Sequence, residues 1–401
     1  MRILIADEFS KGHLDSLRGL GLSVEYKPDA KADDLPALAK DVAILVVRST
    51  EVKKPVFEAA HGLSLVIRAG AGVNTIDVAS ASSHGVYVAN CPGQNAIAVA
   101  ELTLGLMLSA DRRIHDNVAS LREGKWNKKA FSQARGVFGR TLGIVGMGSI
   151  GCAVASRAKA FGMNVVAYSP HLTAARAKEL GVERAESVLE VARRSDVLTV
   201  HVPGSSSTKN IISAQVLAAL PDGALFINTS RADVVDHAAL LEETKKGRLR
   251  AALDVYEGEP KGGEAAFTSP LTSLPNVIGT HHIGASTEQA QDAIATEAVR
   301  IVETWLTKGE VPNCVNVAKK TPAKFQLIVR HHDKVGVLAN VLGELREAGI
   351  NAQELENTVF EGHAAACCKI QLDSKPGDDV MKRIAGRTSE IIFADLVELK
   401  G

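Results

Sequence analysis

The sequence predicts an α/β protein with two parallel-sheet domains, followed by a small α+β domain. Three observations predict it: short apolar runs that alternate with helical patterns, a G-x-G-x-x-G between a strand and a helix, and a β-α-β-β-α-β tail. The 401 residues suffice for two or three domains with substantial cores. Basic and acidic residues are equal in number, 46 each, so no charge excess indicates a nucleic-acid partner.

The first zone, residues 1–95, alternates strand-like and helical patterns. Its apolar runs are RILIA, LSVEY, VAILVV, LSLVI and VYVAN. This rhythm predicts a parallel sheet of flavodoxin type. A helical pattern from 286 to 308 ends at Gly309 and Pro312, where helix-stop signals gather. We expect that helix to cross back, so that 1–95 and 286–312 form one substrate-binding domain.

Membrane and secretory functions are not favoured. The opening MRILIADEFS is typical of a strand rather than of a signal peptide. The most apolar stretch, residues 96–110, is shorter than a membrane span and contains Glu101, so it predicts a buried helix. The five cysteines have neither metal-ligand nor disulfide spacing, which suits a reducing cytoplasm.

The second zone, residues 96–285, predicts a doubly wound dinucleotide-binding domain of Rossmann type. Six strand-like runs follow one another: TLGIVG, NVVAY, DVLTVHV, GALFINT, LRAALDVY and NVIGT. After the first run come Gly146, Gly148 and Gly151 in a G-x-G-x-x-G. In this context, glycines allow a tight turn and let the backbone approach a pyrophosphate at a helix N-terminus.

The residue after NVVAY bears on the choice between NAD and NADP. A carboxylate at this position hydrogen-bonds the adenosine ribose of NAD. Here the residue is Ser169, which can hydrogen-bond a hydroxyl but does not repel a 2′-phosphate, and His171 could assist a phosphate. We therefore expect NAD as the cofactor and keep NADP as an alternative.

Three side chains for alcohol oxidation follow the ends of later strands. Arg231 follows GALFINT, Glu259 follows LRAALDVY, and His282 follows NVIGT. Open parallel sheets bind their ligands at these strand ends. Histidine is a base for a hydroxyl proton, glutamate orients the ring and stabilises its protonated form, and arginine grips a carboxylate through two bonds. Taken singly, each has an ordinary structural explanation: Arg231 as a surface cation, Glu259 as a turn residue and His282 as a capping residue.

Together these pieces resemble the D-2-hydroxyacid dehydrogenase family. The motifs GAGVNTID, NCPGQNAIAVAEL, TLGIVGMGSIG, INTSRADVVDHAAL, ALDVYEGEP and THHIGAST stand in the family's order across residues 45 to 312. The resemblance implies that Arg231, Glu259 and His282 are the catalytic residues, with His282 as the base. The family has proline where this chain has His281, and we expect His281 to face away. A metal role for the histidine pair is not favoured, since no third ligand stands at a usual spacing.

The resemblance also implies residues for binding cofactor and substrate. Besides the three glycines and Ser169, the cofactor residues are Ser82, Ser149, Ile150, Val202, Ser230, Asp254, Gly284 and Ala285. The substrate residues are Arg48, Ser49, Ala71, Gly72, Val73 and Asn95. Arg48 is a partner for a substrate phosphate or, equally, a solvated charge at a strand end. The family builds homodimers or homotetramers around the helix at 96–110, and a neighbouring subunit lends basic residues, for which Lys128, Lys129 and Arg135 are candidates.

After a linker at 313–323, residues 324–401 predict a ferredoxin-like domain that resembles the ACT regulatory domains. That tail favours the phosphoglycerate dehydrogenase branch of the family, which oxidises 3-phospho-D-glycerate to 3-phosphohydroxypyruvate as the first step of L-serine biosynthesis. Of the serine-binding positions of that branch, His331 and Asn351 are kept, but Asp333 and Val335 replace an asparagine and a proline. An amino-acid effector is thus one hypothesis, and a structural or dimerising tail is another.

Two other functions remain open. One is a hydroxypyruvate or glyoxylate reductase, or another D-2-hydroxyacid dehydrogenase, because Ser169 suits an NADPH-using reductase. The other is a non-catalytic NAD-sensing binding protein like the C-terminal-binding corepressors, which share the fold and the triad. The ACT-like tail and the absence of a basic segment disfavour this last function.

Overall fold

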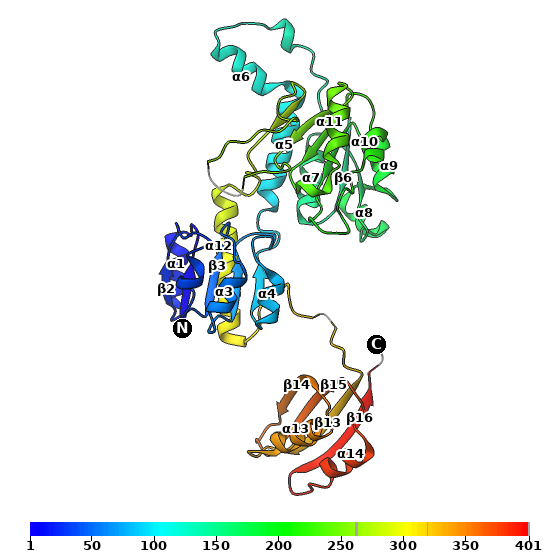
Figure 1. The fold of residues 1–401 in the computed structure, drawn as a ribbon. Helices are drawn as coiled ribbons and strands as arrows, with labels where there is room; N and C mark the ends of the chain where they lie inside the picture. The colour runs from blue at the N-terminus through cyan, green and yellow to red at the C-terminus, as the bar shows by residue number, and fades with distance from the viewer. Residues whose placement is uncertain (261–263, 319, 400–401) are drawn as a thin grey trace. The chain divides into compact units, whose positions relative to one another are not determined.

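Three sheets organise the chain in the computed structural model, which describes residues 1–260, 264–318 and 320–399 (Figure 1). Residue contacts divide the chain into two units, Met1–Asn316 and Val317–Gly401. The first unit holds two parallel sheets, and the second holds one antiparallel sheet.

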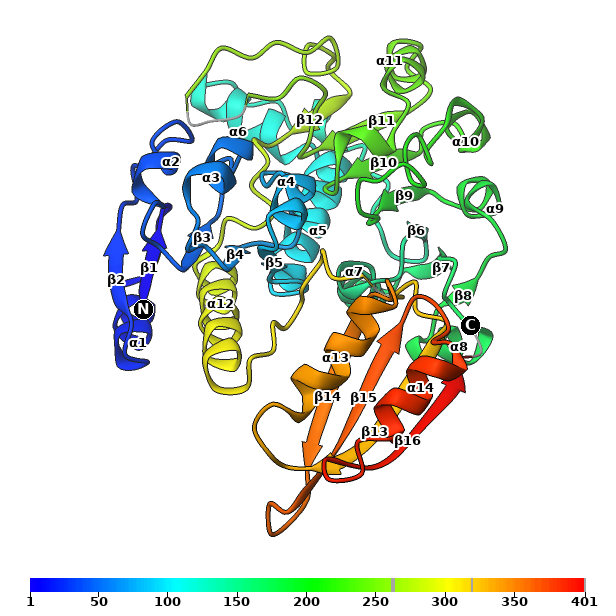
Figure 2. The ribbon, with the colours of Figure 1, turned by 60° about the horizontal axis from the view of Figure 1, so that its bottom comes forward.

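The first sheet has five parallel strands in the order β2-β1-β3-β4-β5 (Figure 2). This order is that of flavodoxin-like folds. Its strands are β1 (Arg2–Ile5), β2 (Ser23–Tyr26), β3 (Ile44–Val47), β4 (Leu65–Arg68) and β5 (Tyr87–Asn90). Its helices are α1 (Lys11–Gly19), α2 (Leu35–Leu38), α3 (Lys54–Ala59), α4 (Val78–Ser83) and α12 (Glu288–Lys308).

Helix α12 packs on this first sheet, as the sequence predicts. Its residues Ile294, Ala298, Ile301 and Val302 are buried in one cluster with strand residues such as Ile3. The apolar spacing along α12 gives this one buried face. The helix therefore returns the chain, after the second sheet, to the lobe in which it began.

The second sheet has seven parallel strands in the order β12-β11-β10-β9-β6-β7-β8, the doubly wound arrangement. Its strands are β6 (Thr141–Val145), β7 (Asn164–Tyr168), β8 (Glu183–Arg184), β9 (Val197–Val200), β10 (Leu225–Asn228), β11 (Arg250–Leu253) and β12 (Val277–Gly279). Its helices are α5 (Ala96–Arg112), α7 (Ser149–Ala160), α8 (Ala174–Leu180), α9 (Val188–Arg193), α10 (Ala214–Ala219) and α11 (His237–Lys245). The sequence predicts six of these strands. The edge strand β8 is not predicted, because its two residues are exposed and form no apolar pattern.

Helix α5 is buried along much of its length, which agrees with the prediction for residues 96–110. After it, α6 (Ile114–Arg122) and a loop with the short helix η1 (Lys129–Phe131) project from the rest of the unit (Figure 1). No residue of α6 is buried. In the described part of the chain, no helix combines the length and apolar character that crossing a membrane requires.

The second unit is a four-stranded antiparallel sheet in the order β14-β15-β13-β16, with two helices on one face (Figure 2). Its elements are β13 (Phe325–His332), α13 (Val337–Glu347), β14 (Ala352–Val359), β15 (Ala365–Leu372), α14 (Asp378–Ala385) and β16 (Ile391–Glu398). The order of elements and the strand order are those of a ferredoxin-like fold, as predicted.

Candidate active site

A cavity of about 450 Å³ lies between the two parallel-sheet lobes of the first unit. Many of the predicted residues line it together. They are Ala71, Gly72, Val73, Asn95, Gly148, Ser149, Ile150, Val202, Ser230 and Arg231. The strands of both lobes end at this cavity, so segments far apart in the sequence converge on it.

The glycine loop is built for close packing on one side and for a ligand on the other. Gly146 has a φ of +98°, and a Cβ there would stand 2.3 Å from the carbonyl oxygen of His201. A Cβ on Gly151 would stand 2.0 Å from the oxygen of Gly146. At Gly148, the N-cap of α7, an added Cβ would meet no atom within 4 Å. The open side at Gly148 and the helix N-terminus behind it fit a pyrophosphate.

Two buried polar atoms in this cavity lack a hydrogen-bond partner in the described part of the chain. They are Oδ1 of Asn95 and Nδ1 of His201. Burial lowers the pKa of His201 to about 3, so the ring is neutral, and its Nε2 already bonds the hydroxyl of Thr199 at 3.0 Å. Buried polar groups are normally satisfied. These two atoms therefore fit a bound polar ligand such as the dinucleotide. His201 carries no motif signal, and sequence reasoning missed it.

Glu259 and His282 form a direct pair. Oε1 of Glu259 lies 2.7 Å from Nδ1 of His282, and Oε2 accepts from the backbone N–H of Tyr256 at 3.3 Å. Burial raises the pKa of Glu259, but the bond to His282 and the charges of His282 and Arg231 outweigh it, so the pKa lies below its usual value. Glu259 is thus ionised at neutral pH, and Arg231 is close enough to act on it. His282 itself has a positive φ of 53°.

Asp254 holds the loop that carries His282. Its Oδ1 accepts from the hydroxyl of Thr280 at 2.6 Å and from the backbone of Ile283 at 2.9 Å, and its Oδ2 accepts from the backbone of Gly284 at 2.9 Å. Asp254 is buried and does not line the cavity, although it was predicted as a cofactor residue. Gly284 is buried in this loop, and Ala285 is half-buried beside it.

Arg231 is held at the point where the two lobes meet. The side chain of Asn228 accepts from the backbone and hydroxyl of Ser230, both at 2.9 Å, and donates to the carbonyl of Arg231 at 2.8 Å. A Cβ on Gly72 would stand 2.9 Å from Nη2 of Arg231, so a larger residue there would require the guanidinium group to shift. Sequence reasoning missed Asn228. Its hydrogen bonds to Ser230 and Arg231 depend on the turn after β10, which no sequence motif predicts.

Arg68, at the end of β4, was also missed, and it lies near both Arg48 and Arg231. Its Nε donates to the carbonyl of Arg48 at 3.0 Å. Burial is the main cause that lowers the pKa of Arg68 to about 10, and the positive charges of Arg231 and Arg48 add to the effect. The guanidinium group of Arg68 thus lies close enough to those of Arg231 and Arg48 to be repelled by both.

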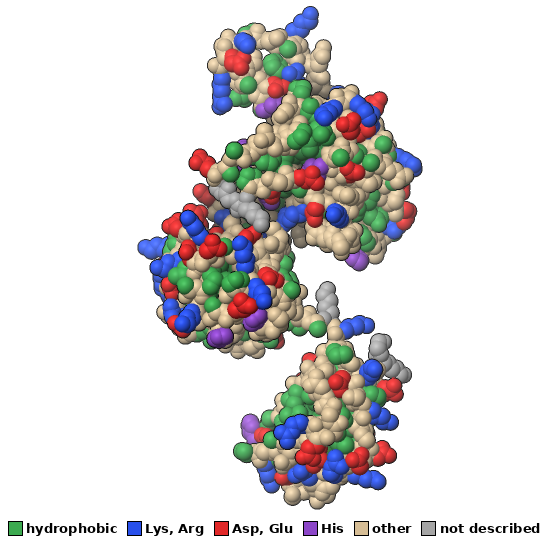
Figure 3. Space-filling model, viewed as in Figure 1, with side chains coloured by type: hydrophobic (Ala, Val, Ile, Leu, Met, Phe, Trp, Pro, Cys, Tyr) green, Lys and Arg blue, Asp and Glu red, His purple; other side chains and the backbone are tan. Residues whose placement is uncertain are grey.

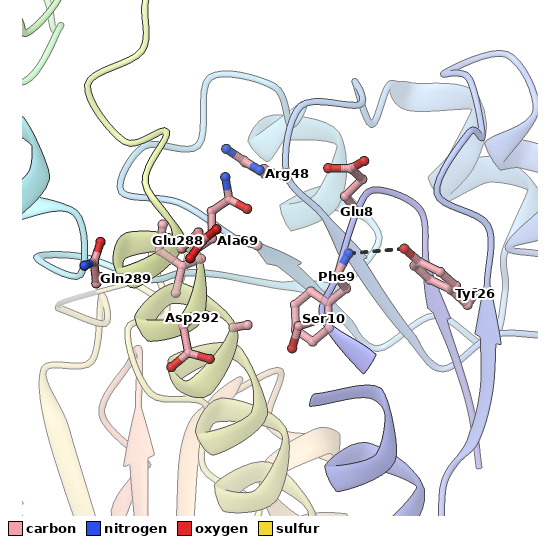
Figure 4. A pocket seen from close by; sticks show the side chains of 12 residues that line it. Glu8, Phe9, Ser10, Tyr26, Arg48, Ala69, Glu288, Gln289 and Asp292 are labelled. Carbon is pink, nitrogen blue, oxygen red and sulfur yellow. Dashed lines mark hydrogen bonds between the residues drawn. The ribbon is translucent and has the colours of Figure 1, made fainter. Parts of the chain in front are cut away.

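Arg48 and Ser49 lie beside a second cavity rather than in the first. The loop from Arg48 to Thr50 is bound through its backbone N–H groups to Oδ2 of Asp7 at 2.6 to 3.1 Å. Arg48 lines a cavity of about 710 Å³ between the loop after β1 and the first turns of α12, together with Glu8, Glu288 and Asp292 (Figure 4). Ser49 is exposed and lines neither cavity.

Of the other predicted residues, Ser82, Ser169, Glu259 and His282 are not among those that line the cavity. Ser82 is exposed on α4, and its hydroxyl donates to the carbonyl of Val78 and accepts from Asn316. Ser169 directly follows β7, as expected for a residue near the adenosine end of a dinucleotide. His281 is exposed and has no hydrogen bond or ion pair in the described residues. In the same residues, no group of three or more His, Cys, Asp or Glu side chains could hold a metal ion.

In the second unit, one copy of the chain does not bring His331 and Asn351 together. His331 is buried, with Nδ1 on the carbonyl of His332 and Nε2 on Asn357. His331 pairs with Ala366, whereas Ala352, next to Asn351, pairs with Leu372 six residues along the same strand. At roughly 3.4 Å per residue, the two sites are about 20 Å apart along the sheet.

Comparison with known proteins agrees with this geometry. Residues 104–284 match the model of the D-isomer specific 2-hydroxyacid dehydrogenase NAD-binding domain. A D-3-phosphoglycerate dehydrogenase from Methanocaldococcus jannaschii is 36% identical over 400 residues, which are 99% of this chain and 73% of that protein. The chain belongs to the D-2-hydroxyacid dehydrogenase family.

Two further similar proteins are named as reductases rather than as phosphoglycerate dehydrogenases. A hydroxypyruvate reductase from Thermotoga maritima is 43% identical over 269 residues, 67% of this chain and 86% of that protein. The structure of an NADPH-dependent glyoxylate/hydroxypyruvate reductase from Sinorhizobium meliloti, in complex with NADP and malonate, matches with a TM-score of 0.67 and 29% identity, over 78% of this chain and 96% of that one. This member of the D-2-hydroxyacid dehydrogenase family is thus an oxidoreductase with a nicotinamide dinucleotide cofactor.

Proposed function

We propose that the chain oxidises 3-phospho-D-glycerate to 3-phosphohydroxypyruvate, with NAD as the cofactor. The observation that carries the proposal is the arginine row, Arg48, Arg68 and Arg231. A substrate with a carboxylate at one end and a phosphate at the other would supply negative charges that offset Arg68 and the two guanidinium groups that repel it. The phosphoglycerate dehydrogenase from M. jannaschii, which aligns with 99% of this chain, supports the same substrate.

In this mechanism, His282 removes the proton from the C2 hydroxyl as the C–H bond at C2 breaks. A nicotinamide bound by the glycine loop would supply the acceptor for the hydride that leaves C2. Arg231 holds the substrate carboxylate and the carbonyl oxygen that forms at C2, and Glu259, 2.7 Å from Nδ1, stabilises the protonated His282. In the reverse direction, His282 returns the proton.

The cofactor would be held by the glycine loop, by the residues around it that line the cavity, and by the orphaned atoms of Asn95 and His201. Ser169 is the residue that discriminates between NAD and NADP in this proposal. Because Ser169 has no charge, NADP is the alternative, and the S. meliloti reductase with bound NADP is a precedent for it in this fold.

The competing function is reduction of hydroxypyruvate or glyoxylate, which the 43% identical relative from T. maritima supports. The test is a comparison of initial rates of NADH and NADPH oxidation with phosphohydroxypyruvate, hydroxypyruvate and glyoxylate. The proposal requires the highest kcat/KM with phosphohydroxypyruvate and NADH. A higher value with either unphosphorylated acid would establish the competing function, and absence of turnover with all three would favour an NAD-sensing protein.

A matched pair of variants tests the arginine row within the same assay. Arg48→Gln should lower kcat/KM for phosphohydroxypyruvate by about 10- to 100-fold, the value of one charge-assisted contact, and leave hydroxypyruvate nearly unchanged. Arg176→Gln, an arginine on α8 paired with Glu179 outside the site, is the control and should change neither. Equal losses on both substrates with Arg48→Gln would contradict a phosphate role.

We also propose that the chain forms a homo-oligomer through α6 and the loop that follows it. Ile114, Val118, Leu121 and Trp126 of this arm are 48%, 39%, 57% and 84% exposed in one copy. Figure 3 shows hydrophobic and basic side chains on this projection. Lys128 and Lys129 are candidates to reach a neighbouring active site, whereas Arg135 pairs with Asp196 of its own chain at 3.2 Å.

For the second unit we propose a structural or dimerising role. The separation of His331 from Asn351 disfavours an amino-acid effector site within one copy. Such a site would need two copies that each supply one end. The oligomer size of the whole chain and of a chain ending at Asn316, measured by light scattering, would test this role.

A further inference from the structure

The loop that follows β3 has its backbone bound to a single acid. The N–H groups of Arg48, Ser49 and Thr50 all donate to Oδ2 of Asp7, at 2.6, 3.1 and 3.1 Å. Successive N–H groups that converge on one point form a binding place for an anion. In this loop the anion is a carboxylate of the same chain.

Strand topology brings the acid and the loop together. β1 and β3 are parallel neighbours, with Ile5 opposite Val46, so the chain leaves both strands at the same edge of the sheet. Asp7 comes shortly after β1 and is half-buried at this edge. The hydroxyl of Thr50 also donates to the carbonyl of Ala6 at 3.3 Å, which ties the end of the loop to the segment that carries Asp7.

The other side of the Arg48 backbone is bound by the strand on the opposite flank. β4 is the second neighbour of β3, and Arg68 at its end donates from Nε to the carbonyl of Arg48 at 3.0 Å. The N–H of Arg48 is therefore held by an acid beside β1, and its C=O by an arginine of β4. Burial is the main cause that lowers the pKa of Arg68, and the negative charge of Asp7 is among the effects that oppose it.

The side chain of Arg48, unlike its backbone, has no hydrogen bond or ion pair among the described residues. It is half-buried and lines the cavity of about 710 Å³ beside α12 (Figure 4). A binding residue whose backbone is fixed beforehand loses less conformational freedom when its ligand arrives. A fixed backbone with a free guanidinium group is thus the arrangement expected of an arginine that binds an anion.

We propose that Asp7 is the positioning residue for Arg48 and thereby sets the preference for a phosphorylated substrate. The positioning rests on the contacts above, and the preference rests on the proposed function, in which Arg48 binds the substrate phosphate. Asp7 acts through the loop and not on the substrate. Because the phosphate takes no part in hydride transfer, a displaced Arg48 weakens substrate binding and leaves the chemical step intact.

Asp7→Ala should therefore raise KM for phosphohydroxypyruvate about tenfold or more, with kcat within about twofold, and leave the kinetics with hydroxypyruvate nearly unchanged. Asp7→Asn keeps one acceptor oxygen but loses the charge, so it should recover part of the affinity. Asp15→Ala removes an exposed acid of α1 that pairs with Arg18 at 2.6 Å, and this matched control should affect neither substrate.

A double variant tests whether Asp7 acts through Arg48. Arg48→Gln/Asp7→Ala should lose no more kcat/KM for phosphohydroxypyruvate than Arg48→Gln alone, because residues that act as a unit are not additive. Additive losses, or equal losses on both substrates with Asp7→Ala, would overturn the proposal.

Amide hydrogen exchange of the full-length protein keeps this proposal separate from the proposed function. The amides of residues 48–50 should be protected in the wild type and should exchange about tenfold faster or more in Asp7→Ala, with the strands of the first sheet unchanged. If the wild type does not prefer phosphohydroxypyruvate, the proposed function fails, and the exchange rates still decide whether Asp7 holds the loop. A wild type that has the preference, with an Asp7→Ala variant that keeps both KM and amide protection, would refute the role of Asp7. If Asp7→Ala does not fold, Asp7→Asn must show both losses in smaller size.

Discussion

Oε1 of Glu259 lies 2.7 Å from Nδ1 of His282, although the two residues follow different strands, β11 and β12. His282 reaches this position with a left-handed backbone, φ 53°, which costs a non-glycine residue about 1 kcal/mol or more. The pairing also orients the ring and leaves Nε2 without a protein partner among the described residues, and this nitrogen would act as the proposed base. The strain and the bond together indicate that the ring orientation is set by tertiary contacts.

Glu259→Gln should lower kcat by roughly 100-fold, because a neutral amide cannot stabilise the protonated ring as a carboxylate does. The pKa of Glu259 lies below its usual value. The carboxylate's contribution to stability is therefore complete above the ordinary glutamate pKa, about 4.3, and is lost as the pH falls through the lower folded-state value. Activity and thermal unfolding measured between pH 3 and 8 test both statements. A Gln variant with the wild-type pH profile for both would refute them.

Replacement of each adjacent histidine should separate their roles. His282→Gln should lose about 10²- to 10⁴-fold in kcat, the range for a missing general base. His281→Ala, at an exposed position with no partner among the described residues, should stay within about twofold of the wild type. Steady-state kinetics with a saturating cofactor give both values. Comparable losses from the two variants would mean that the base is not assigned to His282 alone.

Asp254→Ala should lower kcat while leaving the Kd for NADH nearly unchanged. The reason is that both oxygens of Asp254 bind the loop from Thr280 to Gly284 rather than facing the cavity. Stopped-flow fluorescence gives the Kd, and steady-state rates give kcat. A loss confined to NADH affinity would instead support a direct contact with the nicotinamide. Asp254→Asn, which keeps one acceptor oxygen, should recover part of the rate.

Two glycines of one loop should respond differently to alanine. At Gly146, the positive φ and the 2.3 Å approach to the carbonyl of His201 leave no room, so Gly146→Ala should destabilise the fold by about 2 kcal/mol or more. At Gly148, an alanine Cβ enters open space, so Gly148→Ala should change stability by less than about 1 kcal/mol. It should nevertheless weaken NADH binding about tenfold or more, because the methyl group projects toward the site of the pyrophosphate. Urea unfolding and NADH titration measure the two effects. If Gly148→Ala bound NADH normally, the dinucleotide would not lie against this loop.

The features that the sequence alone could predict are those encoded by local patterns. Alternating apolar runs indicated both parallel sheets, and the glycine spacing between β6 and α7 indicated the cofactor loop. Arg231, Glu259 and His282 were predicted as catalytic residues because each lies a few residues beyond a strand, because parallel strands end at one edge, and because their motifs resemble those of the family. The two-residue strand β8 was missed because its two exposed residues form no apolar run.

Tertiary structure decided which side chains meet. Arg68 donates to the carbonyl of Arg48, and Asn228 donates to the carbonyl of Arg231, through contacts that no motif encodes. Strand register places His331 and Asn351 at opposite ends of one sheet, although the sequence offered them as a pair. The periodicity of a segment is a local property of its residues. The distance between two side chains on different segments is set by register, packing and burial, which arise only when the chain folds.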